Sequence, residues 1–167
     1  MQYWLMKSEP DVFGIDHLAR SKRRTAAWDG VRNYQVRNML RDQMQVGDLG
    51  FFYHSSCALP GIAGVIKISR AGYPDHTALD PENDHYDPRS TPANPIWYMV
   101  DVTLVERFEN VISLGNLRAE PALQDMLILR RGNRRSITPL SAAHWQRILK
   151  LAANNPQSAS RKRGARS

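Results

Sequence analysis

Cysteine is nearly absent from this 167-residue chain, which contains a single one, Cys57. One cysteine excludes an internal disulfide bond and a cysteine-rich zinc site. Long hydrophobic runs are also missing, because no apolar stretch reaches the roughly 20 residues that a membrane-spanning helix needs. The N-terminal residues lack the basic-then-apolar layout of a secretory signal. These absences predict a protein of the reducing cytoplasm that does not enter a membrane.

The sequence also lacks the signatures of catalysis. It contains no nucleophile elbow, no glycine-rich phosphate loop and no paired-histidine metal motif, and its acidic stretch between positions 75 and 87 does not have calcium-loop spacing. We therefore expect no catalytic residue, no cofactor and no metal ion. One alternative stays open, an enzyme acting on a base or nucleotide through His54, Ser55 and Cys57, although neighbours in sequence need not form a site in space.

Positive charge is present in excess, with a formal net charge of +7 and an isoelectric point of about 9.9. This balance favours polyanionic partners. Four of the charges, on Arg161, Lys162, Arg163 and Arg166, lie in a terminal stretch without acidic residues, so the body of the protein is only mildly basic. A protein that coats duplexes through a strongly positive surface is therefore not expected. The tail itself is either a solubilising end or a nucleic-acid arm.

The hydrophobic pattern predicts a single α+β domain over residues 1–153, followed by a disordered basic tail over residues 154–167. Several alternating strands with few crossover units favour a curled sheet or small barrel with packed helices. The segment from 73 to 95 has five prolines and no periodicity, which indicates an ordered functional loop or lid. The expected strands are 3–6, 49–53, 61–69, 96–105 and 136–138, and the expected helices are 15–19, 34–44, 121–129 and 142–153. Ser141 is placed to cap the last helix, and residues 20–27 are expected to form an exposed basic loop.

Residues 28–38 (WDGVRNYQVRN) have the most informative composition in the chain. An aromatic ring for stacking, amides for reading base edges and guanidinium groups for phosphates are the features of a nucleic-acid reader. Asn33 is placed to cap the following helix. The helical spacing of Trp145, and the positions of Trp4 and Trp97 within expected strands, predict that all three belong to the core. Trp28 lies in a polar loop, where core packing and a pocket wall are equally good interpretations.

Two basic clusters flank this aromatic loop. Arg32 and Arg37 lie on either side of the helix start, and a turn carries Arg130, Arg131, Arg134 and Arg135. For each cluster the simpler interpretation is that its arginines are exposed to solvent, at a helix start in the first case and in a turn in the second. They would form a phosphate-binding surface if the fold brings them together.

Two segments, 3–10 (YWLMKSEP) and 28–35 (WDGVRNYQ), resemble the hallmark segments of the EVE domain family. The likeness spans essentially residues 1–152, and Asn133 stands where a serine is expected. It continues through residues 47–48, 51–55, 61–65, 73–75, 86–88, 97–102 and 129–139.

The resemblance implies a PUA-like fold, related to the YTH domains that bind a methylated base in RNA. It also implies a non-catalytic reader whose partner is DNA or RNA with a modified base, with modified cytosine in DNA favoured over a methylated base in RNA. In the related YTH pattern, a Lys-Ser pair after the first strand and a Trp in the following loop help to build the base pocket, and the matching positions here are Lys7, Ser8 and Trp28. We add to that pocket Asn33, Tyr34, His54 and Ser55, and to the phosphate contacts Arg32, Arg37, Arg131, Arg134 and Arg135. A small-molecule or protein-interaction domain is a further alternative, and the oligomeric state is not predicted.

Overall fold

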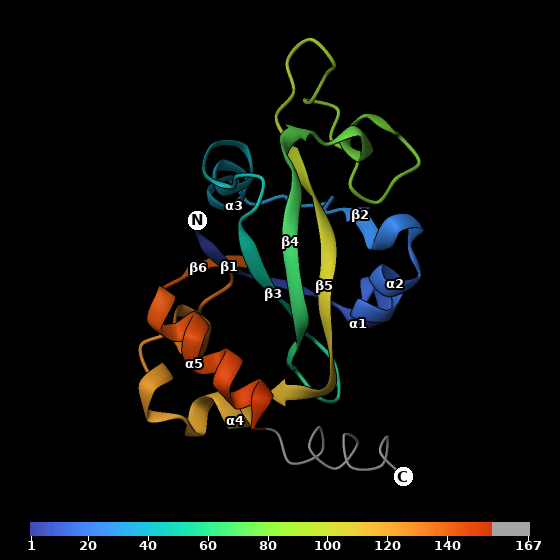
Figure 1. The fold of residues 1–167 in the computed structure, drawn as a ribbon. Helices are drawn as coiled ribbons and strands as arrows, with labels where there is room; N and C mark the ends of the chain where they lie inside the picture. The colour runs from blue at the N-terminus through green and yellow to red at the C-terminus, as the bar shows by residue number, and fades with distance from the viewer. Residues whose placement is uncertain (155–167) are drawn as a thin grey trace.

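Six β-strands form one continuous mixed sheet in the computed structural model of the chain, which describes residues 1–154 (Figure 1). The strands follow one another across the sheet in the order β2-β5-β4-β3-β1-β6. Strand β1 pairs in parallel with β3, and the other neighbouring pairs are antiparallel. Their bounds are Tyr3–Ser8 for β1, Thr25–Ala27 for β2, Leu49–His54 for β3, Gly61–Pro74 for β4, Tyr98–Ser113 for β5 and Ile137–Leu140 for β6.

The sheet is irregular along its two longest strands and is not closed. The register between β4 and β5 shifts at four places, between Ile62 and Gly64, Val65 and Ile66, Ile68 and Arg70, and Arg70 and Tyr73. Such irregularities bend a strand and increase its twist. Among the described strands, no ladder joins β2 to β6. The α+β class is therefore confirmed, and the expected barrel is an open one.

Five short α-helices surround this sheet: α1 (Pro10–Phe13), α2 (Ile15–Arg20), α3 (Tyr34–Asn38), α4 (Leu114–Ala119) and α5 (Ala142–Ala153). Helix α3 continues as a π-helical turn over Met39–Gln43. Both predicted N-caps are confirmed, because the side chain of Asn33 accepts a hydrogen bond from the N–H of Val36 and that of Ser141 from the N–H of His144. These caps fix where α3 and α5 begin.

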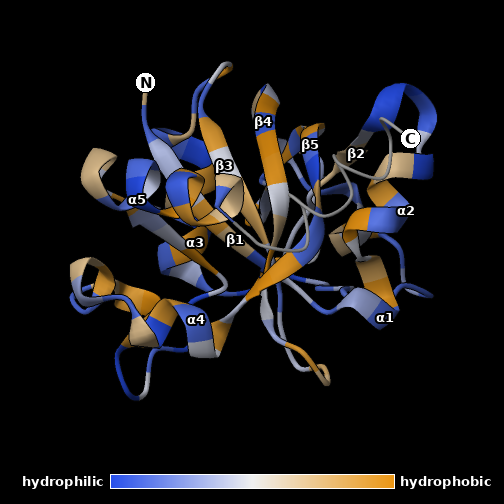
Figure 2. Ribbon diagram, turned by 60° about the horizontal axis from the view of Figure 1, so that its bottom comes forward, coloured by the Kyte–Doolittle hydropathy of each residue, from blue (hydrophilic) through white to orange (hydrophobic). Residues whose placement is uncertain are grey.

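Hydrophobic side chains form two clusters, and successive side chains of β1 belong alternately to one cluster and to the other. Trp4 belongs to one cluster with Phe52, whereas Leu5 belongs to the other with Phe51 and Trp145. Successive residues of a strand point to opposite faces, so a single strand supplies both clusters. In Figure 2 the hydrophobic residues follow the central strands and one side of the helices. Trp4, Trp97 and Trp145 are all buried, as predicted.

Several elements differ from the sequence prediction, and three of them show why. Residues 121–129 form two separate 3₁₀ turns, Pro121–Leu123 and Leu127–Leu129, so the predicted helix is wrong. The buried side chains of Leu123 and Met126 anchor this segment to the core at two points, and such packing overrides helix propensity. Strand β5 runs eight residues beyond its predicted end at Val105, because β4 supplies partners that far. Strand β2 lies in a segment predicted to be an exposed loop.

The structural description ends shortly after α5. Except for Asn154, the predicted disordered tail lies outside the described residues. Within residues 1–154 no helix combines the length and the hydrophobicity needed to cross a bilayer. Across the same residues there is also no group of three or more His, Cys, Asp or Glu side chains that could hold a metal ion.

Candidate functional site

A cavity of about 790 Å³ lies between the two edges of the open sheet. Ala27 lines it from β2, and Lys7 and Ser8 line it from the end of β1. Segments that leave the sheet complete the wall: Glu9, Val12 and Phe13 around α1, residues 28–32 after β2, His76 and His85 from the long loop between β4 and β5, and Ser136 before β6. The volume falls within the range of roughly 300–1,000 Å³ that is typical of ligand pockets.

Trp28 occupies the position where the cavity meets the core. Its backbone N–H donates to the carbonyl of Val100 at 2.7 Å, which continues the β2 ladder by one residue. The indole packs edge-on against Phe52, with ring centroids 5.4 Å apart, and against Phe13 at 6.5 Å. It is only 7% exposed, yet it lines the cavity. Trp28 is therefore a buried core residue and also one of the residues that line the cavity.

Lys7 and Ser8 line the cavity together with Trp28. The Ser8 hydroxyl donates to the carbonyl of Phe13 at 2.7 Å, which holds α1 against the end of β1. The Lys7 ammonium is half-buried and makes no hydrogen bond or ion pair with residues 1–154. Burial lowers the pKa of Lys7. A half-buried cation with no partner in its own chain favours a ligand that brings an acceptor oxygen or nitrogen.

Arg32 fixes the position of the long loop between β4 and β5 against the cavity through hydrogen bonds. Its guanidinium donates to the Oδ2 of Asp75 at 3.0 Å and twice to the carbonyl of His85, at 3.0 and 2.7 Å. The Asp75 side chain is fully buried and also accepts from the backbone N–H of Gly30. Burial by itself would raise the pKa of Asp75, but the hydrogen bonds from Thr77, Gly30 and Arg32 outweigh it and lower that pKa. Arg32 therefore positions the loop, and its donors are not available to a phosphate.

Asp29, His76 and His85 line the cavity but are absent from the predicted site. The imidazole of His85 packs directly over Gly30, where an added Cβ would lie 2.6 Å from the ring. Gly30 also has a φ of +79°, so both its backbone and its neighbour require glycine. The only sequence signal for the histidines is their place in a long proline-rich loop.

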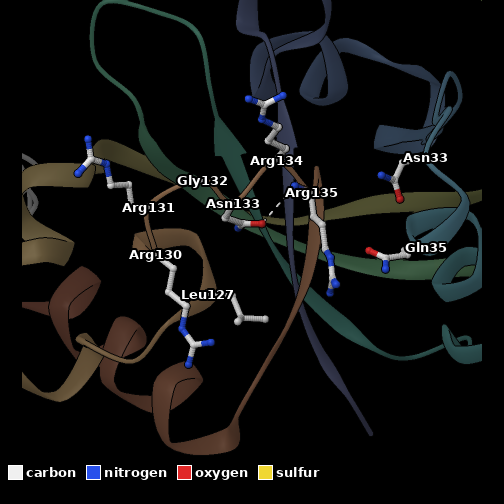
Figure 3. Close-up of a pocket in the computed structure, with 9 residues that line it drawn as sticks. All are labelled: Asn33, Gln35, Leu127, Arg130, Arg131, Gly132, Asn133, Arg134 and Arg135. Atoms are coloured by element: carbon white, nitrogen blue, oxygen red, sulfur yellow. Dashed lines mark hydrogen bonds between the residues drawn. The ribbon is translucent and has the colours of Figure 1, made fainter.

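A second hollow, of about 440 Å³, lies next to the cavity (Figure 3). Arg32 and Ser136 line the cavity, and the residues adjacent to them in sequence, Asn33 and Arg135, line the second hollow. Asn33 and Gln35 face it from the α3 side, opposite the turn that precedes β6. That turn brings four arginines to this second hollow, which we call the arginine hollow: Arg130, Arg131, Arg134 and Arg135. The fold therefore places the distant arginine turn next to the segment that follows Trp28.

The arginines differ in how far the protein itself occupies their donors. Arg37 donates to the carbonyl of Ile96 at 3.1 Å and to the amide oxygen of Asn38, so it braces α3. The guanidinium groups of Arg131, Arg134 and Arg135 make no hydrogen bond or ion pair with the described part of the chain. Three unpaired guanidinium groups on one turn are the arrangement that suits phosphate oxygens.

Three predicted pocket residues line neither hollow. Tyr34 stacks on Trp97 with ring centroids 4.8 Å apart and lies under the guanidinium of Arg37. The Nε2 of His54 accepts a hydrogen bond from the N–H of Ile15 at 3.1 Å, and burial, the largest influence, lowers the pKa of His54. Ser55 donates its backbone N–H to the carbonyl of Ser8. Asn33 lines the arginine hollow, and its side-chain oxygen caps α3.

Comparison with known proteins gives the same picture along the whole domain. The model of a family described as the EVE domain matches residues 2–151. Thymocyte nuclear protein 1 of Homo sapiens is 43% identical, and the match covers 92% of this chain and 75% of that protein. A crystal structure of the human THYN1 protein in complex with DNA containing 5-methylcytosine superposes with a TM-score of 0.87 at 42% identity and covers 93% of this chain and 100% of that one.

Bacterial structures agree. A crystal structure of a protein from Pseudomonas syringae has a TM-score of 0.85 at 48% identity and covers 90% of this chain and 99% of the other. Together with the human structure, it shows that the whole sheet and its helices recur across distant organisms. These matches confirm the PUA-like fold that the resemblance of the sequence implies.

Proposed function

Because this chain belongs to the EVE domain family, we propose that it is a non-catalytic reader of a modified base in nucleic acid. The base turns out of its stack and enters the 790 Å³ cavity, where it packs against the accessible part of Trp28. Modified cytosine in DNA is the favoured ligand, since the human THYN1 protein, which shares this fold, was crystallised with DNA containing 5-methylcytosine.

The observation that carries this proposal is the placement of Trp28. Its ring packs against Phe13 and Phe52, and the residue lines the cavity, so the orientation of the ring is set before a ligand arrives. A base stacked on a prearranged aromatic ring gains roughly 1–3 kcal/mol. The methyl group of a modified base adds about 1 kcal/mol if it is buried, so we expect discrimination against the unmodified base of several-fold.

The arginine hollow gives the bound strand a path beside the cavity. Phosphate contacts supply affinity and register, whereas contacts to the base supply selectivity. Arg131, Arg134 and Arg135 are suited to this role because no residue between 1 and 154 takes up their donors. Arg32 and Arg37 are not, since their donors hold the fold of the site.

A panel of short oligonucleotides tests the proposal. Wild-type protein is titrated with DNA containing cytosine or 5-methylcytosine, and with RNA containing adenine or N6-methyladenine, at one fixed salt concentration. We expect the tightest binding to DNA with 5-methylcytosine. Equal affinity for all members of the panel would refute base reading, and a preference for the RNA with methyladenine would move the ligand to RNA.

Removing two unpaired arginines tests the phosphate path. We expect Arg131→Gln/Arg134→Gln to weaken binding to modified and unmodified DNA by the same factor, because phosphates are identical in both. The slope of log K against log salt concentration should fall by about 2, near one unit for each arginine that no longer binds a phosphate. Lys67→Gln, which removes an exposed charge on β4 outside both hollows, is the control and should leave the slope unchanged. A selective loss for modified DNA would contradict the assignment.

An enzymatic role has no comparable support in the geometry. His54, Ser55 and Cys57 lie outside the cavity wall, and the Nε2 of His54 is occupied by the N–H of Ile15. Turnover of a modified nucleoside that is lost in His54→Ala would restore this alternative.

A further inference from the structure

Asp29 is the carboxyl group nearest in sequence to the stacking ring, and it lines the same cavity. Its side chain is accessible to solvent. No other residue within 1–154 donates a hydrogen bond to it, and only its own backbone N–H does so. Asp75, the neighbouring acid, differs in being fully buried and saturated by donors from Gly30, Arg32 and Thr77. Asp29 therefore has acceptor capacity that the fold does not use.

The surroundings of Asp29 contain charges of both signs. Asp75, His76 and His85 face it from the long loop, and Lys7 and Glu9 line the same cavity at and just after the end of β1. Arg32, on the same loop as Asp29, is paired with Asp75. Although the residue is exposed, partial burial of its carboxyl group is the largest influence and raises the pKa of Asp29. Asp75 raises this pKa further, and His85 and His76 partly offset the rise. The group is therefore easier to protonate than an ordinary surface aspartate.

The polar edge of cytosine has one donor, the exocyclic N4 amine, and beside it one acceptor, N3. An ionised carboxylate accepts from N4 but places its second oxygen against the N3 lone pair, which is repulsive. A single proton between that oxygen and N3 converts the repulsion into a second hydrogen bond. The pair then carries two parallel bonds, and the proton comes from the solvent.

We propose that Asp29 reads the N3 and N4 edge of the cytosine that stacks on Trp28, and that one proton is taken up when the base binds. This inference rests on the proposed function, since it requires a base in the cavity. It assigns recognition of the cytosine ring to Asp29, whereas the apolar wall senses the modification. Binding becomes weaker as the pH rises, because the complex holds a proton that the free partners lack.

Two substitutions of Asp29 separate recognition from proton uptake. The amide of Asp29→Asn supplies an acceptor for N4 and a donor for N3 without any added proton, so we expect near-normal affinity at pH 6 and little change up to pH 8. The wild-type dissociation constant should rise by up to about tenfold per pH unit over that range. Asp29→Ala loses both bonds and should bind about tenfold to a hundredfold more weakly at pH 6.

The measurement is a titration of each variant with a duplex that contains one 5-methylcytosine, between pH 6 and pH 8, with thermal unfolding as a check of the fold. His76→Gln is the matched control, because His76 lines the same cavity and its charge acts on Asp29; the pH slope should persist in this variant. Proton uptake is measured directly by calorimetry in buffers of different ionisation enthalpy.

The outcomes separate the two levels of the proposal. Wild-type affinity in Asp29→Ala, an unchanged pH slope in Asp29→Asn, or a slope lost only in His76→Gln would each overturn the role of Asp29. If the wild-type protein still prefers the modified duplex in those cases, the proposed function stands. Absence of that preference at every pH would instead refute the proposed function itself.

Discussion

Replacing Trp28 with alanine is expected to abolish the preference for a modified base and to destabilise the protein at the same time. The loss of stacking alone removes roughly 1–3 kcal/mol of binding free energy, or about fivefold to more than a hundredfold in affinity. Because the indole is 93% buried against Phe13 and Phe52, the same change should lower the free energy of unfolding by about 3–5 kcal/mol. Urea unfolding and titration with 5-methylcytosine DNA measure the two effects.

Variants that keep the core filled separate binding from folding. Trp28→Phe retains a flat ring against Phe52 and should lose only part of the affinity, whereas Trp28→Leu fills space without a face for stacking and should lose most of it. Both should be more stable than Trp28→Ala, since they leave a smaller void. If Trp28→Leu folds and binds 5-methylcytosine DNA as tightly as Trp28→Phe, the indole is a core residue without a role in stacking.

The second large effect is expected at the ion pair between Arg32 and Asp75. Arg32→Met leaves the fully buried carboxylate of Asp75 without its cation, and removing one partner of a buried pair costs about 3–5 kcal/mol. Arg32 itself is 23% exposed, which places the expected cost at the lower end of that range. The loop that carries His85 also loses two of its hydrogen bonds, so affinity for DNA should fall with stability.

The pH dependence identifies the origin of this stability. A carboxyl group whose pKa is lowered by folding stabilises the native state above its ordinary value of 3.8, and the contribution is lost as the pH falls below that value. The stability difference between wild type and Asp75→Asn, measured by urea unfolding, should therefore be full at pH 7 and shrink below about pH 4. Asp42→Asn, at an exposed surface pair with Arg41, is the control and should change stability little. A difference that does not vary with pH would show that the charge of Asp75 is unimportant.

Much of the fold could be predicted because local pattern and tertiary packing agree. The caps at Asn33 and Ser141, the core positions of Trp4 and Trp145, and the α+β class all follow from side-chain chemistry and periodicity. Strand β2 could not be predicted, since its three residues follow a basic run and form a strand only because β5 offers hydrogen bonds. Its structure depends on a partner that is distant in sequence.

The site was less accessible to sequence reasoning, because donor availability is a property of three dimensions. From the sequence alone, Arg32 and Arg131 are equally plausible phosphate ligands. In the structure Arg32 is committed to Asp75 and the carbonyl of His85, whereas Arg131 has no partner among residues 1–154. Asp29 and His85 could not be predicted either, since they are 56 positions apart in the sequence and only the folded loop brings them to one cavity.

The open edge of the sheet has one more consequence, for how selectivity can change. Ala27 on β2 and Lys7 on β1 line the same cavity, but strands β5, β4 and β3 lie between β2 and β1 in the sheet, so the distance between the two residues depends on the curvature of those strands. Gly64, in an irregular part of β4, leaves no space for a Cβ, which would lie 2.3 Å from the carbonyl oxygen of Glu106. A substitution there would alter the width available to a base without touching any residue that contacts it. Relatives with the same lining can therefore differ in ligand through strand geometry alone.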